Sequence, residues 1–159
     1  MQPMTRLMRF LPYQLSIASN AVSGRIALEY RTRFGLGVPE WRVMAVLGDS
    51  GAMTQRDLTR RTLMDKVAVN RACKALEERG LASRQPNHQD GRSHLLELTH
   101  TGQKMHDDIM PLAMEMERRV FGGFSETEMA IFRAMLEKVR LQADEIIDED
   151  VGSGSFGLD

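Results

Sequence analysis

The chain of 159 residues contains one cysteine, Cys73, so no disulfide can form within it. Small secreted domains without a large core usually depend on disulfides, so that class is excluded and a reducing cytoplasm is expected. Long hydrophobic runs are also missing, since no stretch approaches the roughly 18 apolar residues of a membrane span. The first residues lack the basic, apolar and small-residue order of a secretory signal. The sequence therefore predicts a cytoplasmic protein with no membrane partner.

Signature motifs of common enzyme classes are absent as well. There is no Gly-x-Gly-x-x-Gly after a strand, no P-loop, no Gly-x-Ser-x-Gly and no His-Glu-x-x-His. Histidine recurs every six residues, at His88, His94, His100 and His106. Two helical metal ligands are instead spaced by four residues, and no cysteine pair accompanies these histidines. We therefore expect no catalytic activity, no cofactor and no metal.

Charge is unevenly distributed, although the formal net charge is only −1. Residues 54–94 carry nine Arg or Lys and five Asp or Glu, a local net charge of +4. Residues 144–159 carry six acids and no base. Segregation of this kind says more about partners than the total does. The middle of the chain is the part suited to a polyanion, and the acidic, Gly- and Ser-containing tail is expected to be disordered.

Helical periodicity dominates the rest of the sequence. Apolar residues recur at three- and four-residue steps from Leu11 to Phe34, and again in segments near 105–120 and 129–146. Shorter helices are predicted between them, with Thr54 and Asp65 as N-caps of two of these. The fold class expected is therefore mostly α, with minor β content.

A β-hairpin is predicted where two short apolar runs, 81–85 and 94–98, flank a polar turn. Two short helices followed by a basic helix and a hairpin form a winged helix-turn-helix. The wide apolar stripes of the terminal segments have little in one chain to cover them, so a homodimer is expected. The predicted layout within one structural domain is an N-terminal dimerisation helix (1–37), a winged helix-turn-helix lobe (38–99), C-terminal dimerisation helices (100–147) and a disordered tail (148–159).

The basic helix has the pattern of a DNA recognition helix, because polar side chains share one face and small or apolar ones the other. A helix of this kind fits the major groove, where each base pair displays a distinct pattern. The outward face is predicted to carry Lys66, Asn70, Arg71 and Lys74. The inner face is predicted to carry Val69, Ala72, Cys73 and Leu76. On the preceding helix, phosphate contacts are predicted for Arg56, Arg60 and Arg61.

The hairpin tip, Asp90-Gly91-Arg92, is predicted to reach the adjacent minor groove. Narrow A·T tracts attract arginine there, so Arg92 is the expected contact. Gly91 is expected to permit a tight turn. Asp90 is expected to orient the guanidinium of Arg92 through an ion pair.

This region resembles the multiple-antibiotic-resistance regulator (MarR) family. Asp90-Gly-Arg92, followed by Leu96-Glu-Leu98-Thr99 and Thr101-Gly102, is similar to the Asp-x-Arg…Leu-Thr-x-x-Gly wing signature of that family. MDKVAVNRACKALEERGL, residues 64–81, lies where the family has its recognition helix, and the element order is similar over about residues 10–147. The resemblance implies a homodimer that binds a pseudo-palindromic double-stranded DNA operator, usually as a repressor released by a small ligand.

The same resemblance implies an effector site between the winged lobe and the dimerisation helices. The residues expected there are Ser16, Asn20, Arg25, Trp41 and Arg42. A tryptophan face and an arginine fork suit an aromatic carboxylate. VPEWRVMAVL also resembles regulators of aromatic-acid catabolism in this family. The alternative is that Trp41 belongs to the core and Arg42 to the surface.

Two other functions remain open from the sequence. A helical protein-interaction module would share the fold, but the local charge of +4 favours DNA. A redox-responsive regulator would use Cys73, yet relatives that sense oxidants typically carry a cysteine near the start of the first helix. Cys73 is expected on an inner helix face, where buried cysteines are usually inert.

Overall fold

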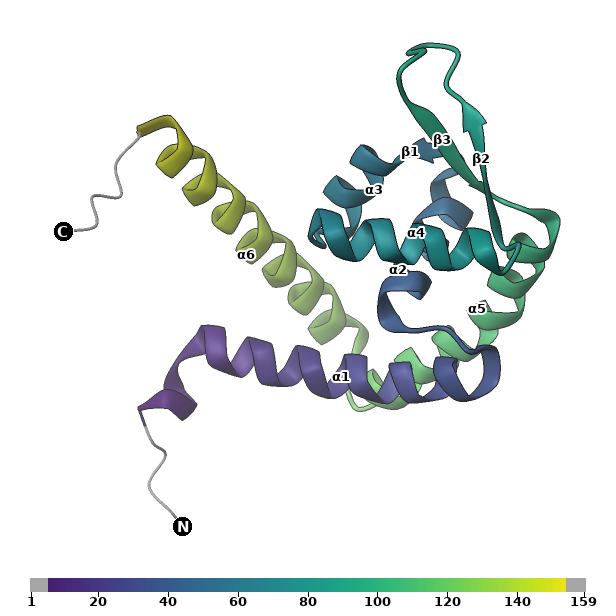
Figure 1. Ribbon diagram of the computed structural model, residues 1–159. Helices are drawn as coiled ribbons and strands as arrows, with labels where there is room; N and C mark the ends of the chain where they lie inside the picture. The colour runs from purple at the N-terminus through teal and green to yellow at the C-terminus, as the bar shows by residue number, and fades with distance from the viewer. Residues whose placement is uncertain (1–5, 154–159) are drawn as a thin grey trace. The chain divides into compact units, whose positions relative to one another are not determined.

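The computed structural model describes residues 6–153, and side chains for residues 6–146. It is mostly helical with one small antiparallel sheet, which confirms the predicted fold class (Figure 1). The elements in chain order are η1 (Leu7–Arg9), α1 (Leu11–Phe34), α2 (Val38–Ser50), β1 (Met53–Thr54), α3 (Gln55–Thr62), α4 (Lys66–Glu78), β2 (Ala82–Pro86), β3 (His94–Leu98), α5 (His100–Phe121) and α6 (Glu126–Ser153).

The chain divides into two compact units, Met1–Met116 and Glu117–Asp159. The hydrophobic core of the described residues lies entirely in the first unit. In α6 no side chain up to Ile146 is buried, so this helix adds nothing to that core.

Local hydrogen bonds start the two helices of the helix-turn-helix as the sequence predicted. The Thr54 hydroxyl accepts from the backbone N–H of Asp57 at 3.1 Å, and Asp65 Oδ1 accepts from the N–H of Ala68 at 2.8 Å. Both are N-caps that satisfy donors left without a partner in the first turn. Between the helices, Leu63 adopts a left-handed conformation with φ 51°. The turn is therefore made by a non-glycine residue.

The inner face of α4 forms the centre of the hydrophobic core. Val69, Ala72, Cys73 and Leu76 are each at most 1% exposed, as the sequence predicted. Burial raises the pKa of the Cys73 thiol to about 11. A protonated, buried thiol is a poor nucleophile, which disfavours the redox-sensing alternative.

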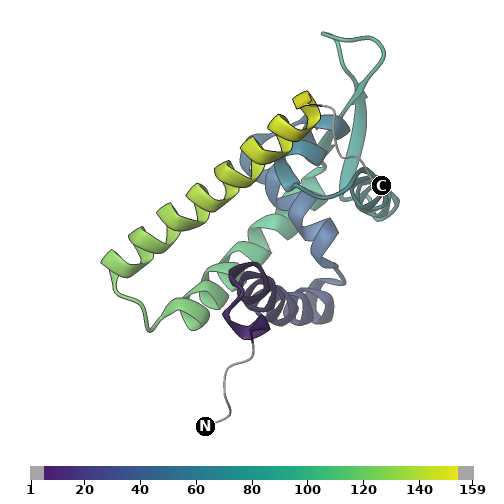
Figure 2. The same ribbon diagram turned by 90° about the vertical axis from the view of Figure 1, so that its left-hand side faces the viewer.

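The sheet has strand order β1-β3-β2, with both pairings antiparallel. In Figures 1 and 2 the β2–β3 hairpin projects beyond α3 and α4 as a wing. Its loop is closed by side-chain turns, because Asn87 Oδ1 accepts from the N–H of Gln89 and Asp90 Oδ1 accepts from the N–H of Arg92. Gly91 lies in a tight turn, as the sequence predicted, because the Ser93 N–H donates to the Asp90 carbonyl at 3.2 Å. The backbone of Gly91 is not left-handed, and the asparagine and aspartate turns make that conformation unnecessary.

The C-terminal turn of α4 is joined to both α1 and α5. Arg79 Nη2 donates to the carbonyl of Phe34 at 2.8 Å, and its Nη1 donates to that of Gly35 at 3.0 Å, at the end of α1. On the α5 side, the Thr99 hydroxyl donates to the Gly80 carbonyl at 2.6 Å. These bonds satisfy carbonyls that a helix end leaves without partners, and they fix α4 to its neighbours.

The helix α6 begins at a side-chain cap and extends into the segment predicted to be a disordered tail. Ser125 and Glu128 form a reciprocal capping box, with Glu128 Oε2 accepting from the Ser125 N–H at 2.8 Å. The helix then runs to Ser153, so residues 148–153 are helical where a disordered tail was predicted. The sequence has no proline or glycine between residue 147 and Gly152 to end it, and residues 154–159 lie outside the described residues. None of the helices in the described part combines the length and apolar character of a membrane span.

We expect Gly102→Ala to lower the free energy of unfolding by about 1–3 kcal/mol, the usual cost of overpacking. A Cβ at this position in α5 would lie 1.8 Å from the Leu81 carbonyl oxygen, a backbone atom that cannot rotate away. Urea titration at matched protein concentration measures the change. Gly91→Ala is the control, because nothing lies within 4 Å of its added Cβ. Equal stabilities of the two variants would contradict the close approach of α5 to the α4–β2 turn.

Candidate nucleic-acid interface

The outward face of α4 presents polar side chains to solvent. Lys66, Arg71 and Lys74 are exposed, and Asn70 is half-buried. Their opposite face is the buried one, so the core fixes which side of the helix faces out. The structure thus places all four predicted residues on one surface. Three cations and an amide on an exposed helix suit phosphates and base edges.

The preceding helix α3 extends this surface. Arg56 and Arg60 on α3 and Lys66 on α4 line one hollow of about 440 Å³, together with Gln55 and Thr59. No acidic side chain belongs to this lining. Three cations around one hollow create a positive potential that attracts phosphate oxygens.

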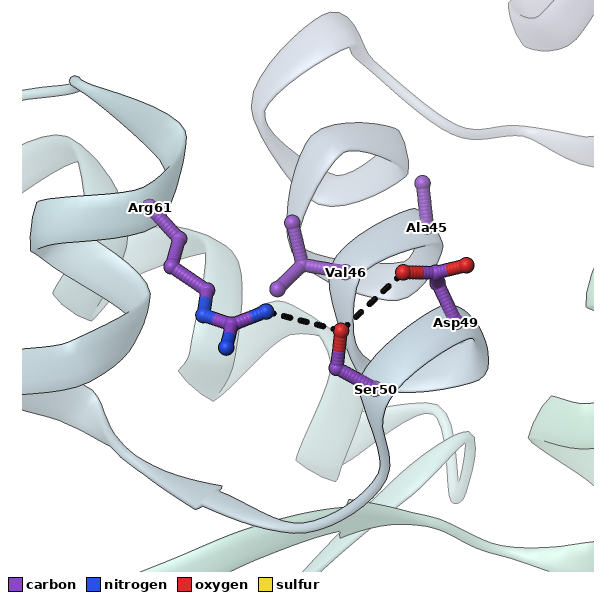
Figure 3. A pocket seen from close by; sticks show the side chains of 5 residues that line it. All are labelled: Ala45, Val46, Asp49, Ser50 and Arg61. Carbon is purple, nitrogen blue, oxygen red and sulfur yellow. Dashed lines mark hydrogen bonds between the residues drawn. The ribbon is translucent and has the colours of Figure 1, made fainter.

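Arg61 has a different environment from its neighbours (Figure 3). Its Nη1 donates to the Ser50 hydroxyl at 2.8 Å, and that hydroxyl donates to Asp49 Oδ2 at 3.0 Å. The arginine, the serine and the aspartate line a pocket at the end of α2 with Ala45 and Val46. Arg61 therefore ties α3 to α2, and its predicted phosphate contact remains a prediction.

At the wing tip both predicted residues are exposed, but their interaction differs from the expectation. Asp90 Oδ1 accepts from the backbone N–H of Arg92 at 3.0 Å rather than from the guanidinium. The short aspartate side chain reaches the N–H two residues ahead more easily than a long side chain pointing outward. The Arg92 guanidinium has no hydrogen-bond or ion-pair partner among the described residues, so all five donors are available to a ligand.

A polar network that sequence reasoning missed connects α3, α4 and β2. Arg84 Nε donates to Glu77 Oε1 at 2.7 Å, and Arg84 Nη2 donates to Gln55 Oε1 at 3.3 Å. Gln55 Nε2 in turn donates to Asn70 Oδ1 at 3.3 Å. The only feature of the sequence that could have indicated this network is a basic residue, Arg84, in the strand that follows α4. Its partners lie up to 29 positions away, where sequence spacing gives no guidance.

The residues predicted for an effector site are not joined into one cluster. Trp41 is half-buried, with its ring centroid 5.0 Å from that of Tyr30 and 6.0 Å from that of His106. Burial raises the pKa of Tyr30, so this ring stays neutral at ordinary pH. Trp41 packs against the core, in agreement with the alternative stated for it. The remaining four are exposed: Ser16, Asn20 and Arg25 on α1, and Arg42 on α2.

Comparison with known proteins is consistent with this geometry. The MarR family model matches residues 34–93. The HTH-type transcriptional repressor IacR of Pseudomonas putida is 24% identical over 107 residues, 67% of this chain and 64% of the relative, so the chain spans less than two thirds of it. The HTH-type transcriptional regulator YwoH of Bacillus subtilis is 26% identical over 129 residues, 81% of this chain and 93% of the relative.

A solved structure agrees over more of the chain. The MarR/EmrR family regulator from Acinetobacter sp. ADP1 superposes with a TM-score of 0.83 at 26% identity, and the match covers 89% of this chain and 99% of that one. The names of these relatives describe transcriptional regulators rather than enzymes, as the sequence led us to expect. With the winged helix-turn-helix and its exposed basic face, these matches show that the chain is similar to the MarR family of transcriptional regulators.

Proposed function

We propose that the protein is a homodimeric repressor that binds a pseudo-palindromic DNA operator and is released from it by a small ligand. The observation that carries the DNA-binding part is the single polar surface of α4. Arg71 and Lys74 point away from a fully buried apolar face. An α-helix with side chains is about 10–12 Å across, which matches the roughly 12 Å width of the major groove.

The wing and α3 support the same mode of binding. The Arg92 guanidinium has no partner among the described residues and lies at the tip of the projecting hairpin. The hollow between α3 and α4 gathers Arg56, Arg60 and Lys66. In this proposal Arg92 enters the minor groove, while the cations of the hollow bind phosphates that position the protein. The repressor role rests on the name of the relative IacR.

Dimerisation is proposed from the apolar surface of the terminal helices. Leu11 in α1 is 75% exposed and Met135 in α6 is 59% exposed. Isolated apolar residues on a surface are normal, but a whole face of a helix is not. The large apolar side chains exposed on α6 are Ile131, Phe132, Met135, Leu136, Val139, Leu141 and Ile146. A second copy of the chain would bury them, and its two-fold symmetry would match a palindrome.

For the ligand we propose an aromatic carboxylate held by Arg42 and Trp41 of α2, with Ser16, Asn20 and Arg25 of α1 as further candidate contacts. Arg42 is exposed next to the half-buried Trp41 on α2. A guanidinium binds a carboxylate through two parallel hydrogen bonds. Trp41 lies between Tyr30 of α1 and His106 of α5, so a ligand that displaced it would alter how α2 packs on both.

The first test separates the two DNA-reading elements. Arg71→Ala should weaken the free energy of binding to the cognate site by about 1–3 kcal/mol. It should also relax the base preference at one position in each half-site, because each base pair presents a distinct pattern in the major groove. Arg92→Ala should weaken binding to all sequences, since the minor-groove pattern is degenerate. Fluorescence anisotropy with cognate and scrambled duplexes at fixed salt gives the specificity ratio. Unchanged cognate binding by both variants would favour the protein-interaction module instead.

The second test addresses the dimer. Met135→Glu should convert the dimer to monomer in sedimentation velocity at micromolar concentration, because a carboxylate buried without a partner costs several kcal/mol. Arg133→Ala is the control on the same helix, since it removes only an exposed ion pair with Glu117. A Met135→Glu protein that sediments as the wild type does would contradict the assignment of α6 to the interface.

The third test uses benzoate as the probe. In the wild type benzoate should release DNA, and Arg42→Ala should shift the half-effective concentration at least tenfold while leaving DNA affinity unchanged. Loss of a charged hydrogen-bonding partner costs about 1.5–3 kcal/mol. Arg33→Ala is the control, because this exposed arginine pairs with Glu29 on α1. An identical benzoate response in Arg42→Ala would exclude Arg42 from the proposed effector site.

A further inference from the structure

In the polar network between α3, α4 and β2, the donor and the acceptor of each hydrogen bond are fixed by the chemistry of its two ends. A carboxylate only accepts hydrogen bonds and a guanidinium only donates them. Arg84 donates to Glu77 at one end, and it donates to Gln55 at 3.3 Å at the other. Gln55 must therefore turn its oxygen, Oε1, toward Arg84.

This orientation of Gln55 determines the orientation of Asn70. With Oε1 facing Arg84, the amide nitrogen Nε2 of Gln55 faces Asn70 and donates to its Oδ1 at 3.3 Å. An amide side chain could otherwise be turned either way, since its oxygen and nitrogen have the same shape. Because Arg84 can only donate, it fixes the orientation of the Gln55 amide, and Gln55 in turn fixes the orientation of the Asn70 amide.

The hydrogen-bonding capacity left on Asn70 is mainly of the donor type. Its oxygen is engaged by Gln55, whereas its Nδ2 has no hydrogen-bond partner among the described residues. No described buried side-chain nitrogen or oxygen lacks a partner, so Nδ2 is open to solvent. Asn70 therefore offers two N–H groups beside the exposed Arg71 and Lys74.

Bases differ in what they present to such a donor. In the major groove, guanine presents the acceptors N7 and O6, adenine presents N7 and thymine presents O4. Cytosine presents only the donor N4–H₂, and the two-bond contact of asparagine with adenine requires the asparagine oxygen to accept from N6. An asparagine whose oxygen is already engaged is matched best by guanine, which has two adjacent acceptors.

We propose that Asn70 reads the operator as a hydrogen-bond donor and selects guanine, and that Gln55 and Arg84 are positioning residues that fix this polarity. The proposal rests on the proposed function, because α4 must lie in the major groove for Asn70 to meet a base. It predicts that the base preference of Asn70 can be inverted without changing Asn70.

The test is Gln55→Glu. A glutamate at this position has an oxygen for Arg84 and a second oxygen facing Asn70, so Asn70 must turn Nδ2 inward and Oδ1 outward. Binding is measured by anisotropy to duplexes in which each base pair of a site selected by the wild type is changed in turn. At the position read by Asn70, the wild type should prefer guanine, and Gln55→Glu should prefer a base with a donor, cytosine or adenine. The relative affinity should invert by about tenfold.

Two variants of Asn70 separate this relay from a direct effect of residue 55. Asn70→Asp can only accept, so it should show the same new preference as Gln55→Glu. In the double variant Gln55→Glu with Asn70→Ala, the preference at that position should disappear. A preference that persists in the double variant would mean that residue 55 itself meets the base, and it would overturn the relay.

The outcomes also distinguish this proposal from the one on which it rests. A wild type that binds all duplexes equally would contradict the proposed DNA-reading function. A wild type that binds selectively while Gln55→Glu keeps the guanine preference would contradict the relay alone.

Discussion

The fixed position of the C-terminal turn of α4 is the constraint on which the rest of the lobe depends. Arg79 binds the carbonyls that end α1, Thr99 binds the carbonyl of Gly80, and Gly102 allows α5 to approach the backbone of Leu81. The helix α4 is thereby attached to α1, which precedes the lobe in the sequence, and to the start of α5, which follows it. A displacement of α1 or α5 must strain these contacts or move α4, which would give the ligand proposed near α1 and α2 a route to the proposed DNA-reading surface.

The other elements take their positions from α4. The apolar face of α4 packs into the core. On its polar face, Gln55 connects α4 to α3 and Arg84 connects it to β2. Arg61 connects α3 to α2. The core fixes which side of α4 faces out, and the polar network fixes how one side chain on that side is turned. Affinity in this scheme comes from cations around phosphates, while selectivity comes from a few oriented side chains in the groove.

Local rules explain which features could be predicted from the sequence. Interactions within four residues along the chain determine the N-caps Thr54 and Asp65 and the buried face of α4. The predictions of these features are confirmed. The prediction for the ion pair of Asp90 was wrong, because its carboxylate accepts from the backbone N–H of Arg92 in a side-chain turn. The extension of α6 to Ser153 was missed, since acidic residues continue a helix as well as they form a loop. The Gln55–Arg84 network depends on tertiary packing, which no sequence spacing encodes.

Selection of binding sites from a pool of random duplex DNA tests the central claim most directly. A symmetric dimer that reads DNA through α4 should enrich an inverted repeat whose half-site centres lie about one helical turn, 10–10.5 base pairs, apart. It should also lose that enrichment when Arg71 and Asn70 are both replaced by alanine. Enrichment of no sequence, or of the same sequence by the doubly substituted protein, would contradict the placement of α4 in the major groove.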